Sequence, residues 1–170
     1  MTKTLHINLL GAPSVTIDNQ PITNFVSNKA RALFYYLAAH PIEHERAKLA
    51  TFLWGGNPKA KRNLRDVIYN LRQSFDPFLT ISRTKISLNL TENVHIDYQQ
   101  FSTLLDQRIK DLEEWRQLLS LYRGELLEGF WLDEQLEYDE WQSITREQVE
   151  MRFTEALETA VGYFFSQQDS

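Results

Sequence analysis

The sequence predicts an α+β fold followed by an all-α helical region, in a chain of 170 residues. Two-residue alternation of apolar side chains is confined to the first half, and helical spacing of apolar side chains continues to the end. Charge divides at the same place. Residues 1–95 hold 12 Lys and Arg against 6 Asp and Glu, a net +6, whereas residues 96–170 hold 6 against 17, a net −11. Because such asymmetry is typical of nucleic-acid or membrane contact by the basic half, we expect two domains with different roles, 1–95 and 96–170.

The composition excludes several classes of function. The chain has no cysteine, which rules out a disulfide framework, thiolate catalysis and cysteine zinc sites. No glycine-rich phosphate loop and no catalytic grouping is visible, so we expect neither an enzyme nor a cofactor. The four histidines are dispersed, which argues against a metal site. No signal peptide and no apolar run of about 18 residues is present, so we expect a cytoplasmic protein without membrane contact.

Strand patterning opens the chain. Leu5, Ile7 and Leu9 alternate with polar residues, as do Val15 and Ile17. Turn-forming Gly, Pro, Asp and Asn separate and follow these two runs. The first 25 residues or so are therefore predicted to form a small antiparallel sheet.

Helical spacing then predicts three helices, over about residues 28–40, 44–54 and 58–75. Ser or Asn at 27 and 28 can cap the first helix, and Pro41 ends it. Gly55 ends the second. In the third, the proline after a capping asparagine suits the first turn.

Residues 79–90 return to alternation around a polar, basic centre, which predicts a β-hairpin with Arg83 and Lys85 near its tip. A sheet, three helices and a hairpin, in this order, are the layout of a winged helix-turn-helix, in which the hairpin is the wing. After residue 95 we expect only helices, over about 96–109, 113–127 and from 134 to as far as 165, with acidic outer faces.

The third helix is the most informative for function. Its apolar stripe leaves an opposite face with side chains that read bases: Arg62, Arg65, Asp66, Tyr69, Asn70 and Gln73. Arginine pairs with guanine and asparagine or glutamine with adenine, and a helix of this diameter fits the major groove. Lys61 adds positive charge at the helix start. The alternative is a solvated basic face in which Asp66 pairs with Arg62.

The chain resembles the SARP family of bacterial transcription regulators (the antibiotic regulatory protein family). Residues 1–95 resemble an OmpR-type winged helix-turn-helix, and residues 96–170 resemble the start of the bacterial transcriptional activator domain, a helical-repeat (TPR-like) module. The segments that carry the resemblance are Leu5 to Gly11, Lys29 to Leu33, Leu49 and Ala50 with Leu53 to Gly55, Asn63 to Arg65, Asn70 to Arg72 and Tyr122 to Gly129. The hairpin reads Ser-Arg-Thr-Lys-Ile where the family usually carries glycines and a tyrosine.

The resemblance implies a sequence-specific, DNA-binding transcriptional activator that binds double-stranded DNA at direct repeats as paired protomers, with RNA polymerase as a partner. It implies that ten residues lie on or beside DNA: Lys29 and Arg31 at a phosphate, Lys61, Arg62, Arg65, Tyr69, Asn70 and Arg72 along the third helix, and Arg83 and Lys85 on the wing. Because the family's helical module is about twice as long as residues 96–170, we expect this chain to hold part of it.

Other interpretations stay open at this point. In the main alternative, the winged helix docks a protein partner and the helical half acts as a short adaptor, which predicts no salt-dependent DNA binding. Trp115, Trp131 and Trp141 are expected in the core, or in a minority interpretation in a partner-binding groove. The acidic pairs at 133–134 and 139–140 are expected on a solvated helix face rather than at a cation site.

Overall fold

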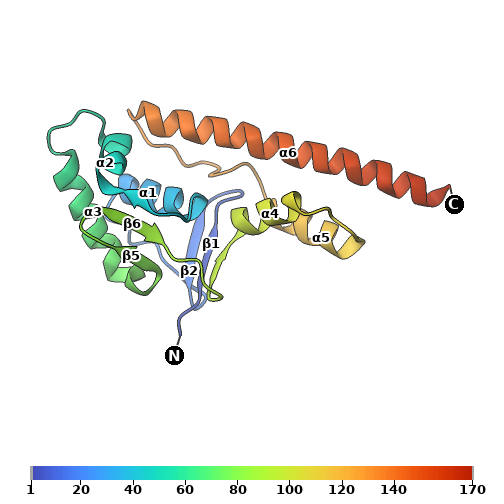
Figure 1. Cartoon of the computed structure of the whole chain (residues 1–170), viewed down its shortest axis with the longest axis horizontal. Coiled ribbons are helices and arrows are strands. Elements are labelled where there is room, and N and C mark those ends of the chain that lie inside the picture. The colour runs from blue at the N-terminus through green and yellow to red at the C-terminus, as the bar shows by residue number, and fades with distance from the viewer. Residues whose placement is uncertain (1, 170) are drawn as a thin grey trace.

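The computed structural model describes residues 2–169. Its first sheet has four strands, β1 (Leu5–Asn8), β2 (Ser14–Ile17), β3 (Gln20–Pro21) and β7 (Val94–Ile96), in the order β3-β2-β1-β7 (Figure 1). The first three strands are antiparallel, as the alternation predicts. The turn after β1 passes through Gly11, whose φ of 101° is open to glycine and strained for other residues.

Three helices follow the sheet, close to the predicted ranges: α1 (Asn28–Ala39), α2 (Arg46–Trp54) and α3 (Ala60–Phe75). Ser27 caps α1, since its side chain accepts a hydrogen bond from the backbone N–H of Ala30. A 3-10 turn (Asp76–Phe78) then leads out of α3. The helices close over an aromatic core in which the rings of Phe34 and Phe75 stack at 4.1 Å.

The hairpin is formed by β5 (Leu79–Ile81) and β6 (Lys85–Leu88), joined by a short turn. A third strand, β4 (His44–Glu45), pairs with β6, giving a sheet of order β4-β6-β5. Helical spacing predicted that these two residues begin the second helix. They are extended because β6 offers them backbone partners, which local spacing does not reveal.

The second half holds α4 (Asp97–Asp106), α5 (Leu112–Leu121) and α6 (Leu136–Gln168). The expected helix over 113–127 is thus shorter than predicted, because residues after 121 leave it for a long connection that returns to the first sheet. In that connection Leu126 bridges to Leu10. The start of α6 packs against α1 and α2, where Tyr138 is fully buried.

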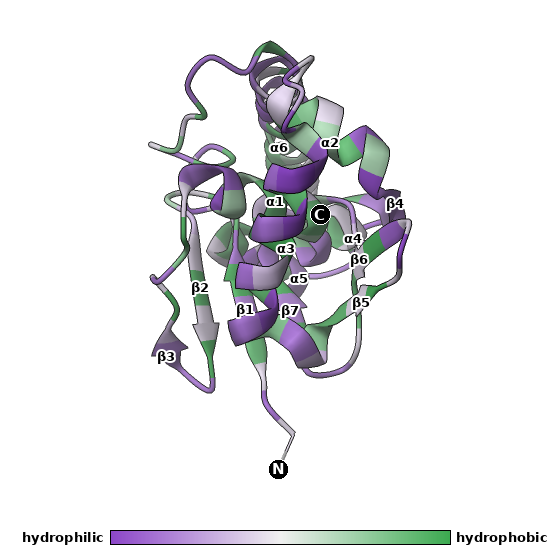
Figure 2. Cartoon of the chain, turned by 90° about the vertical axis from the view of Figure 1, so that its left-hand side faces the viewer, coloured by the Kyte–Doolittle hydropathy of each residue, from purple (hydrophilic) through white to green (hydrophobic). Residues whose placement is uncertain are grey.

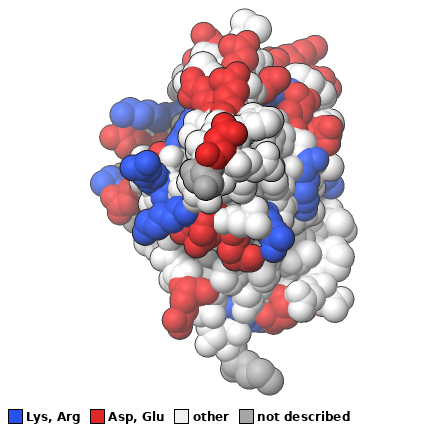
Figure 3. Space-filling model, turned by 90° about the vertical axis from the view of Figure 1, so that its right-hand side faces the viewer, with Lys and Arg blue, Asp and Glu red and all other residues white. Residues whose placement is uncertain are grey.

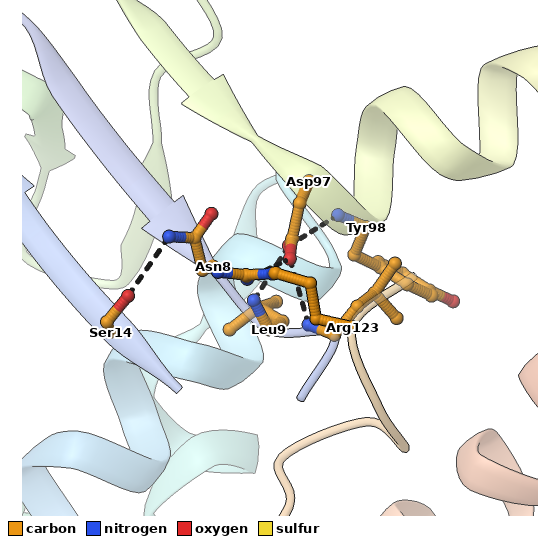
Figure 4. Close-up of polar contacts among 7 residues, drawn as sticks. Asn8, Leu9, Ser14, Asp97, Tyr98 and Arg123 are labelled. Carbon is orange, nitrogen blue, oxygen red and sulfur yellow. Dashed lines mark hydrogen bonds and ion pairs between the residues drawn. The ribbon is translucent and has the colours of Figure 1, made fainter. Parts of the chain in front are cut away.

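Strand β7 crosses the predicted domain boundary, since it runs from residue 94 to 96 and pairs in parallel with β1. Directly after it, Asp97 is buried at the end of β1 (Figure 4). Its carboxylate accepts hydrogen bonds from the backbone N–H groups of Leu9 (2.7 Å), Leu10 (2.9 Å) and Tyr98 (2.7 Å), and from Arg123 (3.0 Å). We call this junction the seam. It joins the two halves into one continuous core.

Acidic side chains gather over α6, at the top of the face in Figure 3. No helix between residues 2 and 169 combines the length and the apolar character needed to span a membrane.

Candidate nucleic-acid interface

The outer face of α3 is polar and open to solvent. Leu64, Ile68 and Leu71 are buried under the helix, whereas Tyr69 on the opposite side is 69% exposed. Figure 2 looks at this end of the molecule, with α3 at the front and largely hydrophilic. The helix therefore presents the face that the sequence predicts, and the apolar stripe holds it in place.

Two arginines at the centre of this face are exposed and unengaged. The side chains of Arg62 and Arg65 make no hydrogen bond or ion pair with any other residue in the described range 2–169. The pair between Arg62 and Asp66, on which the solvated-face alternative depends, is not formed there. Arg72 differs, because its Nε donates to the Asp76 carboxylate at 3.0 Å. The guanidinium groups of Arg62 and Arg65 are thus available for an external acceptor.

Asn70 lies on the flank of α3 and is half-buried. Its Oδ1 accepts a hydrogen bond from the backbone N–H of Val26 at 3.2 Å. This contact fixes the amide plane, and it leaves the Nδ2 donor as the group with which Asn70 is able to meet a base.

The two basic residues at the start of α1 lie against aromatic rings. The Nζ of Lys29 is 5.1 Å from the centre of the Trp54 ring, and the guanidinium of Arg31 is 5.6 Å from that of Phe25. Burial lowers the pKa of Lys29, and the negative charge of Glu134 opposes this shift. Both cations are therefore partly engaged within the molecule.

The wing carries one paired and one unpaired cation. Lys85 bonds to the Glu43 carboxylate at 2.9 Å, and this hydrogen bond raises the pKa of Lys85. Arg83 occupies the turn, is exposed, and has no ion pair within the part of the chain that the structure describes.

A hollow of about 500 Å³ lies between the starts of α2 and α3 and the wing turn. We call it the basic hollow, because four of its lining residues are cations and one is an acid: Arg46, Lys61, Arg83, Lys85 and Glu45. The structure thus brings together three predicted DNA-binding residues from two separate elements. It adds Arg46, which sequence reasoning missed. The sequence did offer one signal for Arg46: it is a basic residue near the start of the second predicted helix, which precedes the predicted DNA-reading helix.

Across residues 2–169, no group of three or more His, Asp or Glu side chains is arranged to hold an ion.

Comparisons with known proteins identify the fold. No family model matches the chain, and no curated protein matches it by sequence. Among solved structures it is similar to EmbR of Mycobacterium tuberculosis, in complex with a low-affinity phosphopeptide, with a TM-score of 0.67 and 20% identity. The match covers 90% of this chain and 44% of EmbR, so the chain spans less than half of that protein's length. At this identity the likeness shows a common fold, and its coverage of 90% of the chain reaches into both halves.

Proposed function

We propose that this protein is a bacterial transcription regulator of the SARP type that binds specific DNA sequences through α3. The observation that carries the proposal is the open face of α3, where Arg62 and Arg65 are exposed and have no partner within the described residues. The basic hollow beside it supplies further cations in the position of a wing. The fold shared with EmbR, a SARP-family regulator, supports the same class of function.

The residues divide into two roles under this proposal. Arg62, Arg65 and the Nδ2 group of Asn70 read base edges in the major groove, because their donors match guanine or base acceptors there. Tyr69, exposed between them, packs against the groove wall. The remaining predicted cations bind phosphates and set the orientation on the duplex: Lys29, Arg31, Lys61, Arg72, Arg83 and Lys85. Because Lys29 and Arg31 are already engaged by rings, we expect them to contribute less than Arg83.

We propose that the helical half has the regulatory role, because residues 96–170 resemble the start of an activator domain. Binding to direct repeats as paired protomers, contact with RNA polymerase and activation rather than repression belong to the same proposal. No catalytic step is involved.

Selection of binding sites from random duplex DNA, followed by mobility-shift titration, tests the function directly. Arg65→Ala should weaken specific binding about 5- to 150-fold, since a bidentate arginine–guanine pair contributes roughly 1–3 kcal/mol. Arg116→Ala is the matched control, because it removes the same charge from an exposed site on α5. Arg83→Ala should weaken binding to all sequences and reduce the salt slope by about 1.

Two outcomes contradict the proposal. Equal affinity of Arg65→Ala and Arg116→Ala for the selected site excludes Arg65 as a base-reading residue, and the same result for Arg62→Ala and Asn70→Ala excludes α3 as the reading element. A chain that enriches no sequence and shows no salt-dependent binding to duplex DNA favours the protein-adaptor alternative instead.

A further inference from the structure

Arg46, the first residue of α2, contacts the wing turn twice. Its backbone N–H donates to the carbonyl oxygen of Thr84 at 2.8 Å, and its Nη1 donates to the carbonyl oxygen of Ser82 at 3.0 Å. These two carbonyls flank Arg83, the unpaired cation of the wing. One residue of the helix body therefore holds the turn on both sides of Arg83.

On the β6 side, Lys85 pairs with Glu43, outside the hairpin. The contacts of Ser82, on the β5 side, other than that with Arg46 lie within the hairpin. The N–H of Ser82 donates to the Lys85 carbonyl at 2.9 Å, and the Ser82 hydroxyl accepts from the Lys85 N–H at 3.0 Å. They give the turn its shape but do not attach it to the helices. The pairing of β4 with β6 consists of two residue pairs and ends at Glu45, opposite Lys85. The Arg46 side chain is thus the contact that reaches the far side of the turn.

The chemistry of arginine suits this task. A guanidinium has five N–H donors in a rigid plane, so one donor is able to hold the Ser82 carbonyl while others face the basic hollow. Lysine keeps the positive charge but offers a point charge on a flexible stem. Arg46→Lys therefore keeps the positive charge and removes the planar arrangement of donors.

We propose that Arg46 is a positioning residue for the wing: it holds the turn at residues 82–85 against the start of α2, so that Arg83 meets the DNA backbone beside the groove that α3 occupies. This inference rests on the proposed DNA-binding function. Arg46 acts through Arg83, and its own charge is the smaller part of its contribution.

A double-mutant cycle separates this role from a simple loss of charge. Arg46→Ala should weaken binding to the selected DNA about 5- to 10-fold, the size of the net contribution of one ordinary hydrogen bond, because water competes for the Ser82 carbonyl at this exposed turn. Arg46→Ala in an Arg83→Ala background should cause a further loss of less than about twofold, because the positioned group is already absent. Arg46→Lys should resemble Arg46→Ala more than wild type. Lys48→Ala, two residues further along α2 and 80% exposed, is the control for charge.

Two readouts report position and not only affinity. Hydroxyl-radical footprints should lose protection on the flank that the wing covers, in Arg46→Ala and not in Lys48→Ala. In the free protein, the ¹⁵N order parameter of the Arg83 amide should fall from about 0.85 towards 0.6 in Arg46→Ala, whereas Thr84 stays bound by the backbone N–H of residue 46. The variant's melting temperature shows that the fold persists.

The outcomes are distinguishable. Additive losses in the cycle, with an unchanged footprint and an equally rigid turn, overturn the positioning role while leaving DNA binding intact. Arg46→Lys with wild-type affinity overturns it as well, because charge alone then suffices. A wild-type chain that binds no DNA overturns the proposed function and, with it, this inference.

Discussion

Replacing Asp97 with asparagine probes the seam between the two halves. Burial raises the pKa of Asp97, while the three backbone N–H groups and Arg123 that face its carboxylate oppose that shift. Whether or not the Asp97 carboxyl is protonated, the four groups that face it are hydrogen-bond donors. Asparagine keeps one acceptor oxygen, which is able to serve Leu9 and Tyr98, but its NH₂ group then faces the donors of Leu10 and Arg123.

The cost follows from these contacts. An unsatisfied buried donor costs about 1–3 kcal/mol, and Leu10 is fully buried. Arg123 is 46% exposed and recovers water, so its loss is discounted. With the charge-assisted bonds also lost, we expect Asp97→Asn to lower the free energy of unfolding by about 3 kcal/mol. For a chain of this size, that corresponds to a fall in Tm of roughly 6–12 °C.

Differential scanning calorimetry at pH 7 measures this change. Asp106→Asn is the matched control, because Asp106 also bonds an arginine but is 71% exposed, and surface pairs contribute about 1 kcal/mol or less. A Tm for Asp97→Asn within about 2 °C of the control would refute the reasoning. The carboxylate would then not be needed to satisfy the donors at the seam.

Two further predictions concern a histidine and a glycine. His40 accepts a hydrogen bond from the indole N–H of Trp141 at 2.9 Å, which requires an unprotonated Nε2, and burial, followed by the nearby His44, lowers its pKa below 6.5. The unfolded chain therefore binds the proton more readily, so Tm should fall as pH is lowered from about 6.5 towards 5, and His40→Gln should flatten this dependence. Gly11→Ala should cost about 1–3 kcal/mol in urea unfolding, because φ is 101° and the new Cβ meets the Arg123 side chain at 3.3 Å. Gly56→Ala has open space and should change stability by less than about 0.5 kcal/mol; equal effects would count against strain at Gly11.

Local elements were predictable because their signals lie in neighbouring residues. Alternation in the first 17 residues located β1 and β2, and helical spacing with its stop residues located α1 and α3. The hairpin followed from the same alternation. The predicted start of α3 was two residues early, which is the usual uncertainty at a helix end.

Long-range pairing was not predictable. Strand β7 is three residues long and pairs with β1 across nearly ninety residues of chain, so nothing in its own sequence indicates a partner. The helix expected over 113–127 ends at Leu121 for a related reason. The apolar Leu126 and Leu127 suit a helix by spacing, but their burial comes from contact with the first sheet.

The sequence could predict which helix face carries the candidate site, but not which of its side chains are already bound to other parts of the protein. Sequence indicates which face of α3 carries Arg62 and Arg65, because periodicity defines the face. It does not indicate that Asn70 bonds to Val26, or that Lys29 lies over Trp54, since those partners come from other elements. The ten predicted contacts therefore remain a prediction, and the structure ranks them by how free each side chain is.

The seam also changes what the charge split does. If the halves moved independently, the +6 half would meet a polyanion with the −11 half in no fixed place, and the acidic half would not orient α3. The shared sheet and Asp97 instead fix a +6 half and a −11 half in one body, with α3 at one end and the end of α6 at the other (Figure 1). Such a body has a large dipole. The field of a polyanion orients the positive end of this dipole towards the polyanion, at separations comparable to the Debye length of about 8 Å at physiological ionic strength. Under the proposed function, the acidic half therefore steers α3 towards DNA, because the rigid seam makes the two charges act together.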